Sequence, residues 1–245
     1  MEALLRWEHP VKGTITPDGF IPFLEERGLI IDVGRWVLNE ACREAAAWHR
    51  QGHRASISVN VSMRQLESDQ LVEDVSDALS TSGLDASMLI LEVTESTLMR
   101  DSVATVARLN RLKQLGVKVA IDDFGTGYSS LAYLRQFPVD VLKIDRSFVA
   151  DMTRSPDAAA LIHTLIELGH TLGLVTLAEG IETQEQLEGL RAERCIYGQG
   201  FLFSGPVTAV EMADLLDIAH AGKPVTSVDP APSIAASERP TRAAR

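Results

Sequence analysis

Residues 117–130 read VKVAIDDFGTGYSS, an apolar run that passes into two adjacent acids and a glycine-punctuated turn. The run through Ile121 is typical of a buried strand, in which successive side chains point to opposite faces. A strand that ends here lets Asp122 and Asp123 both turn toward its open end, where paired carboxylates attract a cation. The glycines allow the turn to approach a phosphate or a neighbouring subunit before Ser129 begins a helix. Taken alone, a segment of this kind is more often a solvated turn, and the rest of the chain decides between the two interpretations.

Composition and charge limit the class of protein. The chain has 245 residues, 45% of them hydrophobic, which suits one large α/β domain better than two domains. Its formal net charge of -11 argues against nonspecific binding to DNA or to an anionic membrane. Cys42 and Cys195 form no metal-ligand cluster and are typical of reduced thiols. With no apolar run of membrane-spanning length and no signal-peptide pattern, we expect a cytoplasmic protein.

Strand and helix patterns alternate along the chain. Strands are expected near residues 1–7, 57–61, 88–95, 117–121, 139–145 and 174–179, and helices near 17–27, 33–48, 63–79, 106–115, 131–135, 156–172, 184–190 and from 208 onward. In the helix near 33–48, Trp36 and Trp48 fall on one apolar face, so we expect both in the core. The domain should occupy residues 1–221, because residues 222–245 have the composition of a disordered tail.

This alternation favours a TIM-like (β/α) barrel over an open doubly wound sheet, since no dinucleotide-binding glycine repeat is present. The strand ends of such a barrel meet at one rim. The oxygen-bearing side chains expected there are Glu2, Asn60, Glu92, Asp122, Asp123, Asp145 and Glu179. So many oxygen donors require cations, and hard oxygen ligands select Mg²⁺ or Mn²⁺. Alternatively, each acid only caps the helix after its strand.

Several short motifs follow one another in order. They are EALLRW at residues 2–7, NVS at 60–62, LEVTES at 91–96, the segment 122–131, KID at 143–145, AEGIET at 178–183 and QGF at 199–201. In this order the chain resembles the EAL-domain cyclic-di-GMP phosphodiesterases over residues 2–206. The family's domain has an additional strand before its first motif, with a Tyr-Gln-Pro-Ile-like sequence. We therefore expect a barrel that lacks its first strand and leaves an unpaired edge.

The resemblance implies a site for two metal ions. The ligands it implies are Glu2, Asn60, Glu92 and Asp122 for the first ion, and Asp123, Asp145 and Glu182 for the second ion or its waters. Thr94 and Glu95 would support the turn after Asp123, which in this family couples the site to a dimer interface. A homodimer is therefore expected, and a longer parent protein would carry a regulatory domain.

The implied reaction is hydrolysis of one phosphodiester of cyclic di-GMP, which gives linear pGpG and lowers the concentration of the second messenger. In that reaction Glu179 would act as the general base or water-orienting carboxylate. Lys143 would help to hold the attacking water and offset phosphate charge. Gln199 would contribute to this network, and Arg6 would bind a substrate phosphate.

Two other hypotheses come from different classes of protein. A catalytically inactive receptor would bind cyclic di-GMP or a protein partner, and would show nucleotide binding without hydrolysis in saturating Mg²⁺. A barrel lyase or isomerase would use the metal and acids on a small carboxylate substrate. Asn60, the glycine-rich turn and the ordered motifs disfavour this third hypothesis.

Overall fold

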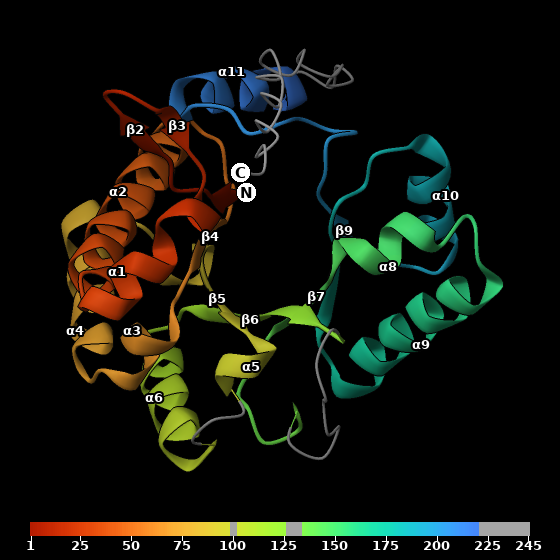
Figure 1. Ribbon diagram of the computed structural model, residues 1–245, viewed down its shortest axis with the longest axis horizontal. Coiled ribbons are helices and arrows are strands. Elements are labelled where there is room, and N and C mark those ends of the chain that lie inside the picture. Colours follow the sequence, from red (N-terminus) through yellow and green to blue (C-terminus); the bar gives the residue numbers. More distant parts are fainter. Residues whose placement is uncertain (99–101, 126–133, 221–245) are drawn as a thin grey trace, which may run out of the picture.

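The computed structural model describes residues 1–98, 102–125 and 134–220. Within them, the main sheet has seven strands in the order β1 (Glu2–Ala3), β4 (Ile57–Asn60), β5 (Leu89–Thr94), β6 (Lys118–Phe124), β7 (Val141–Ile144), β8 (Val175–Ala178) and β9 (Tyr197–Gly198). Every neighbouring pair is parallel, and the sheet curls into a half-barrel (Figure 1). The expected TIM-like architecture is thereby confirmed. In the described residues, β1 and β9 are the two edges of this sheet.

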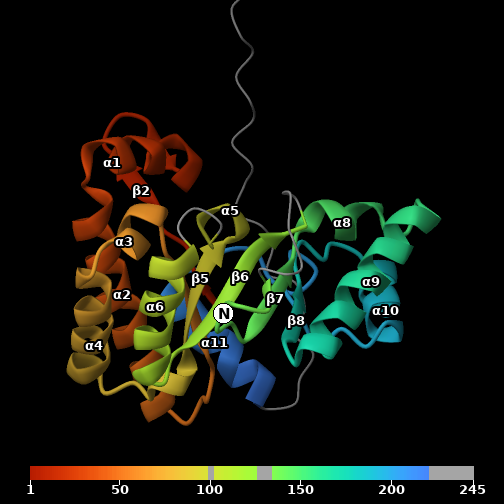
Figure 2. The same cartoon turned by 90° about the horizontal axis from the view of Figure 1, so that it is seen from below.

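Helices cover the sheet along its length (Figure 2). They are α1 (Ile21–Arg27), α2 (Ile30–Arg50), α3 (Met63–Glu67), α4 (Gln70–Ser82), α5 (Glu95–Leu98), α6 (Ser102–Gln114), α8 (Arg146–Asp151), α9 (Pro156–Leu172), α10 (Gln184–Ala192) and α11 (Ala209–His220), with 3₁₀ turns at Pro17–Gly19 and Ala86–Met88. Helices α2, α4 and α6 lie beside the first half of the sheet, and α8, α9 and α10 beside the second half (Figures 1 and 2). No helix in the described ranges is both long and apolar enough to cross a membrane.

The two faces of the sheet differ in chemistry because side chains alternate along each strand. On one face, Val59, Leu91 and Leu142 are at most 1% exposed and belong to the hydrophobic core. On the other, Glu92 and Lys143 are also buried, so the interior of the curved sheet is polar. Burying charged groups is costly unless they pair with one another, and the interior face is therefore where a functional site is expected.

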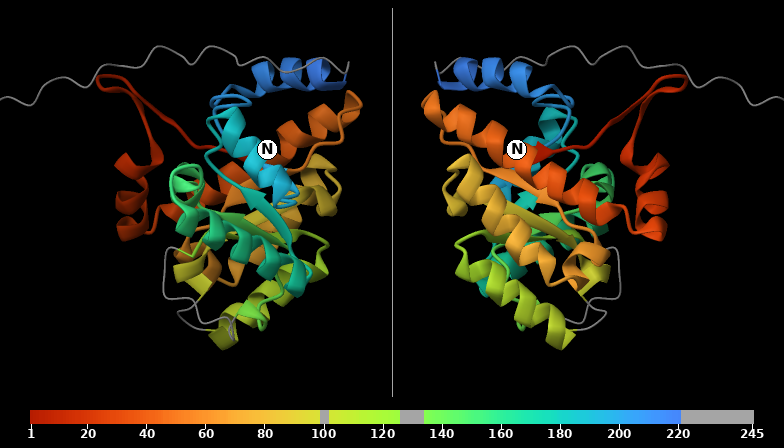
Figure 3. Two further views of the ribbon diagram at one scale, coloured as in Figure 1. Left: turned by 90° about the vertical axis from the view of Figure 1, so that its right-hand side faces the viewer. Right: turned by 90° about the vertical axis from the view of Figure 1, so that its left-hand side faces the viewer.

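The N-terminal segment differs from the expected single strand. Only β1 joins the main sheet, whereas β2 (Trp7–His9) pairs antiparallel with β3 (Gly13–Ile15) in a separate hairpin. The Trp7 ring packs edge-on against His9 and Phe20, with centroids 5.0 and 5.9 Å apart. These contacts hold the chain away from the sheet, and Figure 3 shows the hairpin and α1 standing out from the other helices.

One of the two tryptophans expected in the core is not there. Trp48 is 5% exposed, as predicted, but Trp36 is 58% exposed. The buried stripe of α2 runs through Gly34 and Leu38. Trp36 is two positions from each of them and therefore falls on the opposite side of the helix. Two expectations concern residues that the structure does not describe: the start of the helix after Ser129 and the tail at 222–245.

Candidate functional site

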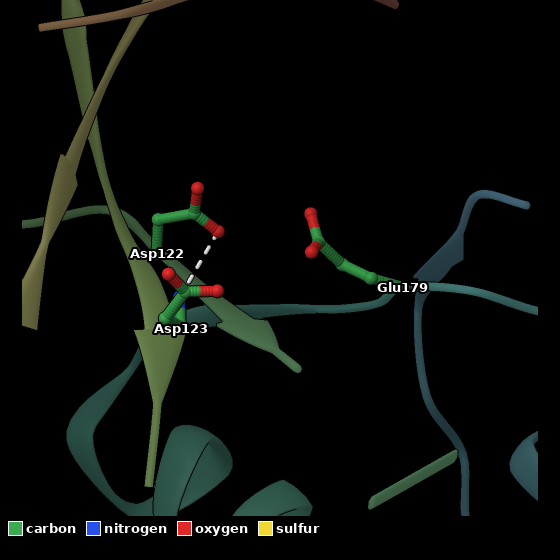
Figure 4. Close-up of side chains that lie close together, drawn as sticks. All are labelled: Asp122, Asp123 and Glu179. Atoms are coloured by element: carbon green, nitrogen blue, oxygen red, sulfur yellow. Dashed lines mark hydrogen bonds between the residues drawn. The ribbon is translucent and has the colours of Figure 1, made fainter. Parts of the chain in front are cut away.

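The end of β6 brings two carboxylates to the same side. The strand does not stop at Ile121, as the sequence suggested, but continues to Phe124. Between these residues its register with β7 shifts, and Asp123 has a left-handed φ of 53°. An extra residue in one strand re-aims its side chains, and left-handed backbone is uncommon outside glycine. The Asp123 backbone N–H donates to Asp122 Oδ1 at 3.0 Å, and both carboxylates face Glu179 in Figure 4.

Lys143, on β7, lies between acids from four other segments, of which Glu2, Glu92 and Asp122 are on β1, β5 and β6 and Glu179 directly follows β8. Its Nζ is 2.6 Å from Glu92 Oε2, 2.6 Å from Glu179 Oε1, 3.0 Å from Asp122 Oδ1 and 3.8 Å from Glu2 Oε2. The Lys143 side chain is 1% exposed, and that of Glu92 is 3% exposed. The pairing with the ammonium offsets part of the cost of burying these carboxylates.

A chain of hydrogen bonds joins the two edges of the sheet at this cluster. Gln199, just after β9, donates from Nε2 to Glu2 Oε2 at 2.9 Å and to Glu179 Oε1 at 3.0 Å. Asn60 donates from Nδ2 to the other oxygen of Glu2 at 2.8 Å. Side chains separated by up to 197 positions are thus fixed relative to one another. Gln199 therefore orients the carboxylate of Glu179 from the far edge of the sheet.

The environment changes the acidity of these groups. Burial raises the pKa of Glu179 to about 7, although Lys143 opposes this effect. Burial also raises the pKa of Glu92. For Asp123, burial together with the neighbouring charges of Asp122 and Asp145 raises the pKa. Burial lowers the pKa of Lys143, but the surrounding carboxylates outweigh burial and raise it overall.

The donor set fits a hard divalent cation. Asp122, Asp123 and Glu179 each offer a carboxylate oxygen, and these oxygens lie within 4.8 Å of one another (Figure 4). Because the amide nitrogen of Asn60 faces Glu2, its amide oxygen is free to act as a ligand. Carboxylate and amide oxygens are the ligands that Mg²⁺ and Mn²⁺ prefer. The residues present therefore suit the ions expected from the sequence.

Comparison with known proteins agrees with this geometry. The sequence pattern of the EAL domain matches residues 1–206. The chain belongs to the EAL domain family. It is 48% identical to the bifunctional diguanylate cyclase/cyclic di-GMP phosphodiesterase MucR and 44% identical to the cyclic di-GMP phosphodiesterase NbdA, both of Pseudomonas aeruginosa. These matches cover 86% and 88% of this chain, which spans only 31% and 28% of the respective relatives.

Solved structures of EAL domains have the same fold. The phosphodiesterase PaMucR in complex with c-di-GMP matches with a TM-score of 0.83 and 48% identity, over 86% of each chain. The EAL enzyme Bd1971, in its form bound to cAMP and cyclic-di-GMP, matches with a TM-score of 0.84 and 35% identity, over 88% of this chain and 59% of the other. The half-barrel is thus the shared architecture of these proteins.

Two predicted metal ligands of this EAL domain do not pair with Lys143 in the described part of the chain. Asp145 caps α8, because its Oδ1 accepts hydrogen bonds from the Ser147 backbone at 3.0 Å and hydroxyl at 2.5 Å. The alternative interpretation, in which each acid caps the helix after its strand, therefore holds for one carboxylate oxygen of Asp145. Glu182 is exposed, and within the described part of the chain its carboxylate makes no hydrogen bond or ion pair. Their roles as ligands stay predictions.

The residues expected to support or extend the site have different surroundings. Glu95 is 5% exposed and accepts a hydrogen bond from the Gly125 backbone at 3.0 Å, so it holds the start of the turn after Asp123. Thr94 instead contacts the Thr97 hydroxyl at 2.8 Å. Arg6 donates to the carbonyl of Leu5 at 2.8 Å. Across the described residues, Arg6 pairs with no carboxylate and remains available to an anion.

Sequence reasoning overlooked one buried polar residue. Ser58 is 6% exposed, and its hydroxyl lies against Glu92, where hydrogen bonding favours the charged carboxylate. It also contacts the carbonyl of Met1 at 3.3 Å. The signal was present, because Ser58 shares a strand face with Asn60 two residues later. A serine carries too little chemical information to stand out without its neighbours.

Proposed function

We propose that this EAL domain is a metal-dependent phosphodiesterase that hydrolyses cyclic di-GMP to linear pGpG. The observation that carries the proposal is the meeting of Glu2, Glu92, Asp122 and Glu179 around Lys143. An acidic pocket binds an anionic phosphodiester only when cations offset its charge. The cyclic di-GMP phosphodiesterase activities for which MucR and NbdA are named, and the c-di-GMP complex of PaMucR, support the same substrate.

Two ions, Mg²⁺ or Mn²⁺, would be held by residues from six segments. For the first ion we propose Glu2, Asn60, Glu92 and Asp122, and for the second ion or its waters Asp123, Asp145 and Glu182. When bound, such ions activate a water and stabilise negative charge on the attacking and leaving oxygens. The closeness of the Asp122 and Asp123 oxygens, within 4.8 Å, supports the placing of these two residues at the ions.

The remaining residues act directly on the water and the substrate. Glu179 accepts the proton of the attacking water, and Gln199 holds its carboxylate in place through the 3.0 Å hydrogen bond. Lys143 orients the water and offsets charge on the phosphate. Arg6, whose guanidinium pairs with no carboxylate among the described residues, binds a phosphate of the substrate.

The experiment that tests the proposal is hydrolysis of cyclic di-GMP with Mn²⁺ or Mg²⁺ against an EDTA control. We expect turnover to pGpG that EDTA abolishes. Asp123→Asn should shift the Mn²⁺ titration of activity to higher concentration, whereas the exposed Asp77→Asn on α4 should leave it unchanged. If the folded chain binds the nucleotide in saturating Mg²⁺ without hydrolysing it, the protein is a receptor and the proposal fails.

We further propose that the domain acts in the cytoplasm as a homodimer and as part of a longer protein with a regulatory domain. The hydrogen bond from the Gly125 backbone to Glu95 supports the proposal that the turn after Asp123 couples the site to a dimer interface. The short span of this chain on MucR and NbdA supports a longer parent. Light scattering of the purified chain would test the dimer, and a monomer at all concentrations would exclude it.

A further inference from the structure

The ammonium group of Lys143 is surrounded by carboxylates in this structure. Its Nζ has three carboxylates within 3.0 Å, those of Glu92, Glu179 and Asp122. Glu92 Oε2 accepts a hydrogen bond from it, and Asp122 and Glu179 form ion pairs with it. With the side chain only 1% exposed, water has almost no access. An attacking water or a phosphate would therefore have to replace at least one of these partners to reach Lys143.

Two of these carboxylates, those of Glu92 and Asp122, are ones that the proposed first ion needs. Asp122 belongs, with Asp123 and Glu179, to the group whose oxygens lie within 4.8 Å of one another. Glu92 is a proposed ligand of the first ion, and its Oε2 is 2.6 Å from the ammonium. A cation bound to these oxygens would lie close to the positive charge of Lys143. Repulsion between them is strong where little water screens it.

We propose that Lys143 competes with the divalent cation for Glu92 and Asp122, so that ion binding and withdrawal of the ammonium from these carboxylates form one coupled step. Glu179, also 2.6 Å away, is the partner that the ammonium keeps. Once withdrawn, Lys143 has N–H groups for the water and the phosphate. The inference rests on the metal site of the proposed function and is independent of the nucleotide.

Coupling of this kind is reciprocal, and its sign can be measured. If the ammonium must leave oxygens that the ion takes, its presence weakens ion binding. Replacing Lys143 with an uncharged residue of similar length should therefore tighten binding of the ion. If Lys143 only holds the ligands in place, the same replacement should weaken binding. The two readings predict opposite changes.

The test is Mn²⁺ binding to Lys143→Met, without nucleotide, followed by electron paramagnetic resonance of free Mn²⁺. We expect a dissociation constant at least about tenfold lower than for the unaltered chain. The matched control is Lys113→Met, since Lys113 pairs with Asp140 at 2.5 and 2.6 Å at the opposite end of β7. Its Mn²⁺ affinity should not change. Equal or weaker binding by a folded Lys143→Met, checked by circular dichroism, overturns the inference.

A second measurement does not depend on that variant folding. In the unaltered chain with ¹³C-labelled lysine, Mg²⁺ should move the NMR signal of the Lys143 Cε group and leave that of Lys113 in place. The signal is assigned with Lys143→Arg. An unmoved Lys143 signal at saturating Mg²⁺, or no ion binding at all, overturns the inference. Tighter Mn²⁺ binding by Lys143→Met, together with no hydrolysis of cyclic di-GMP by the unaltered chain, would uphold it and refute only the proposed function.

Discussion

Replacing Glu179 with glutamine separates catalysis from binding at this site. The carboxylate lies 2.6 Å from Lys143 Nζ and 3.0 Å from Gln199 Nε2, and its side chain is 16% exposed. Glutamine has the same shape, and its amide oxygen can accept hydrogen bonds from both neighbours. The variant Glu179→Gln should therefore keep the packing of the cluster but lose the group that, in the proposed mechanism, accepts a proton from water.

The size of the expected loss follows from that single role. A positioned general base contributes roughly 10²- to 10⁴-fold to a rate. Such a factor corresponds to about 2.7–5.5 kcal/mol of transition-state stabilisation. We expect kcat for cyclic di-GMP to fall by this factor, while the dissociation constant for the nucleotide changes less than about threefold. Single-turnover assays in Mn²⁺ would give the rate, and calorimetry in Ca²⁺ would give the affinity.

The control for this variant is Glu185→Gln, an exposed acid on α10 that should change neither quantity. A Glu179→Gln protein that turns over within about fivefold of the unaltered rate would refute the general-base role. A variant that loses nucleotide affinity and rate to the same extent would show instead that Glu179 organises the pocket. The expected loss of about 10²-fold or more in rate is far larger than this limit of about fivefold.

Two further predictions concern stability. Gly180 has a φ of 67°, and a Cβ there would lie 2.4 Å from the Cβ of Arg146, whereas Gly173 has a φ of 71° and open space around it. Gly180→Ala should therefore lower the free energy of unfolding, measured in urea, by about 1–3 kcal/mol more than Gly173→Ala. Equal losses would contradict this. Glu193 raises the pKa of His163 above 6.5, so its stabilisation is present below pH 6.5 and is lost as pH rises through the raised pKa. The melting temperature of the unaltered chain should exceed that of Glu193→Gln at about pH 5.5 and match it at about pH 9. A difference in melting temperature that persists at the higher pH would show that the ion pair does not cause it.

The fold and the general location of the site could be predicted because both depend on regular patterns. Alternating helices and strands indicated the barrel, and acids at several strand ends indicated one shared rim. In the structure Asn60 lies directly opposite Glu92 on the neighbouring parallel strand, and Glu2 lies opposite Ser58, two positions before Asn60 on the same strand face. Such pairings follow from topology, so a sequence that reveals topology also reveals them.

The detailed geometry could not be predicted because it depends on neighbours that are distant in sequence. The shift in register that turns Asp123 into the site needs β7 beside β6. The capping role of one Asp145 oxygen depends on whether a helix starts at the next residue. Trp36 belongs to an apolar stripe by spacing alone, but it is 58% exposed because the fold buries a different stripe of α2.

The position of Lys143 explains how this fold can bury so many acids. Two carboxylates a few ångströms apart repel each other by several kcal/mol at an effective dielectric constant of about 20. Glu2, Glu92, Asp122 and Glu179 come from separate segments, so no local feature of the sequence compensates that repulsion. One ammonium within 3.8 Å of all four does so in the folded chain. If a divalent cation displaces the ammonium from Glu92 and Asp122, as proposed above, the charge that stabilises the folded chain would become available to the reaction.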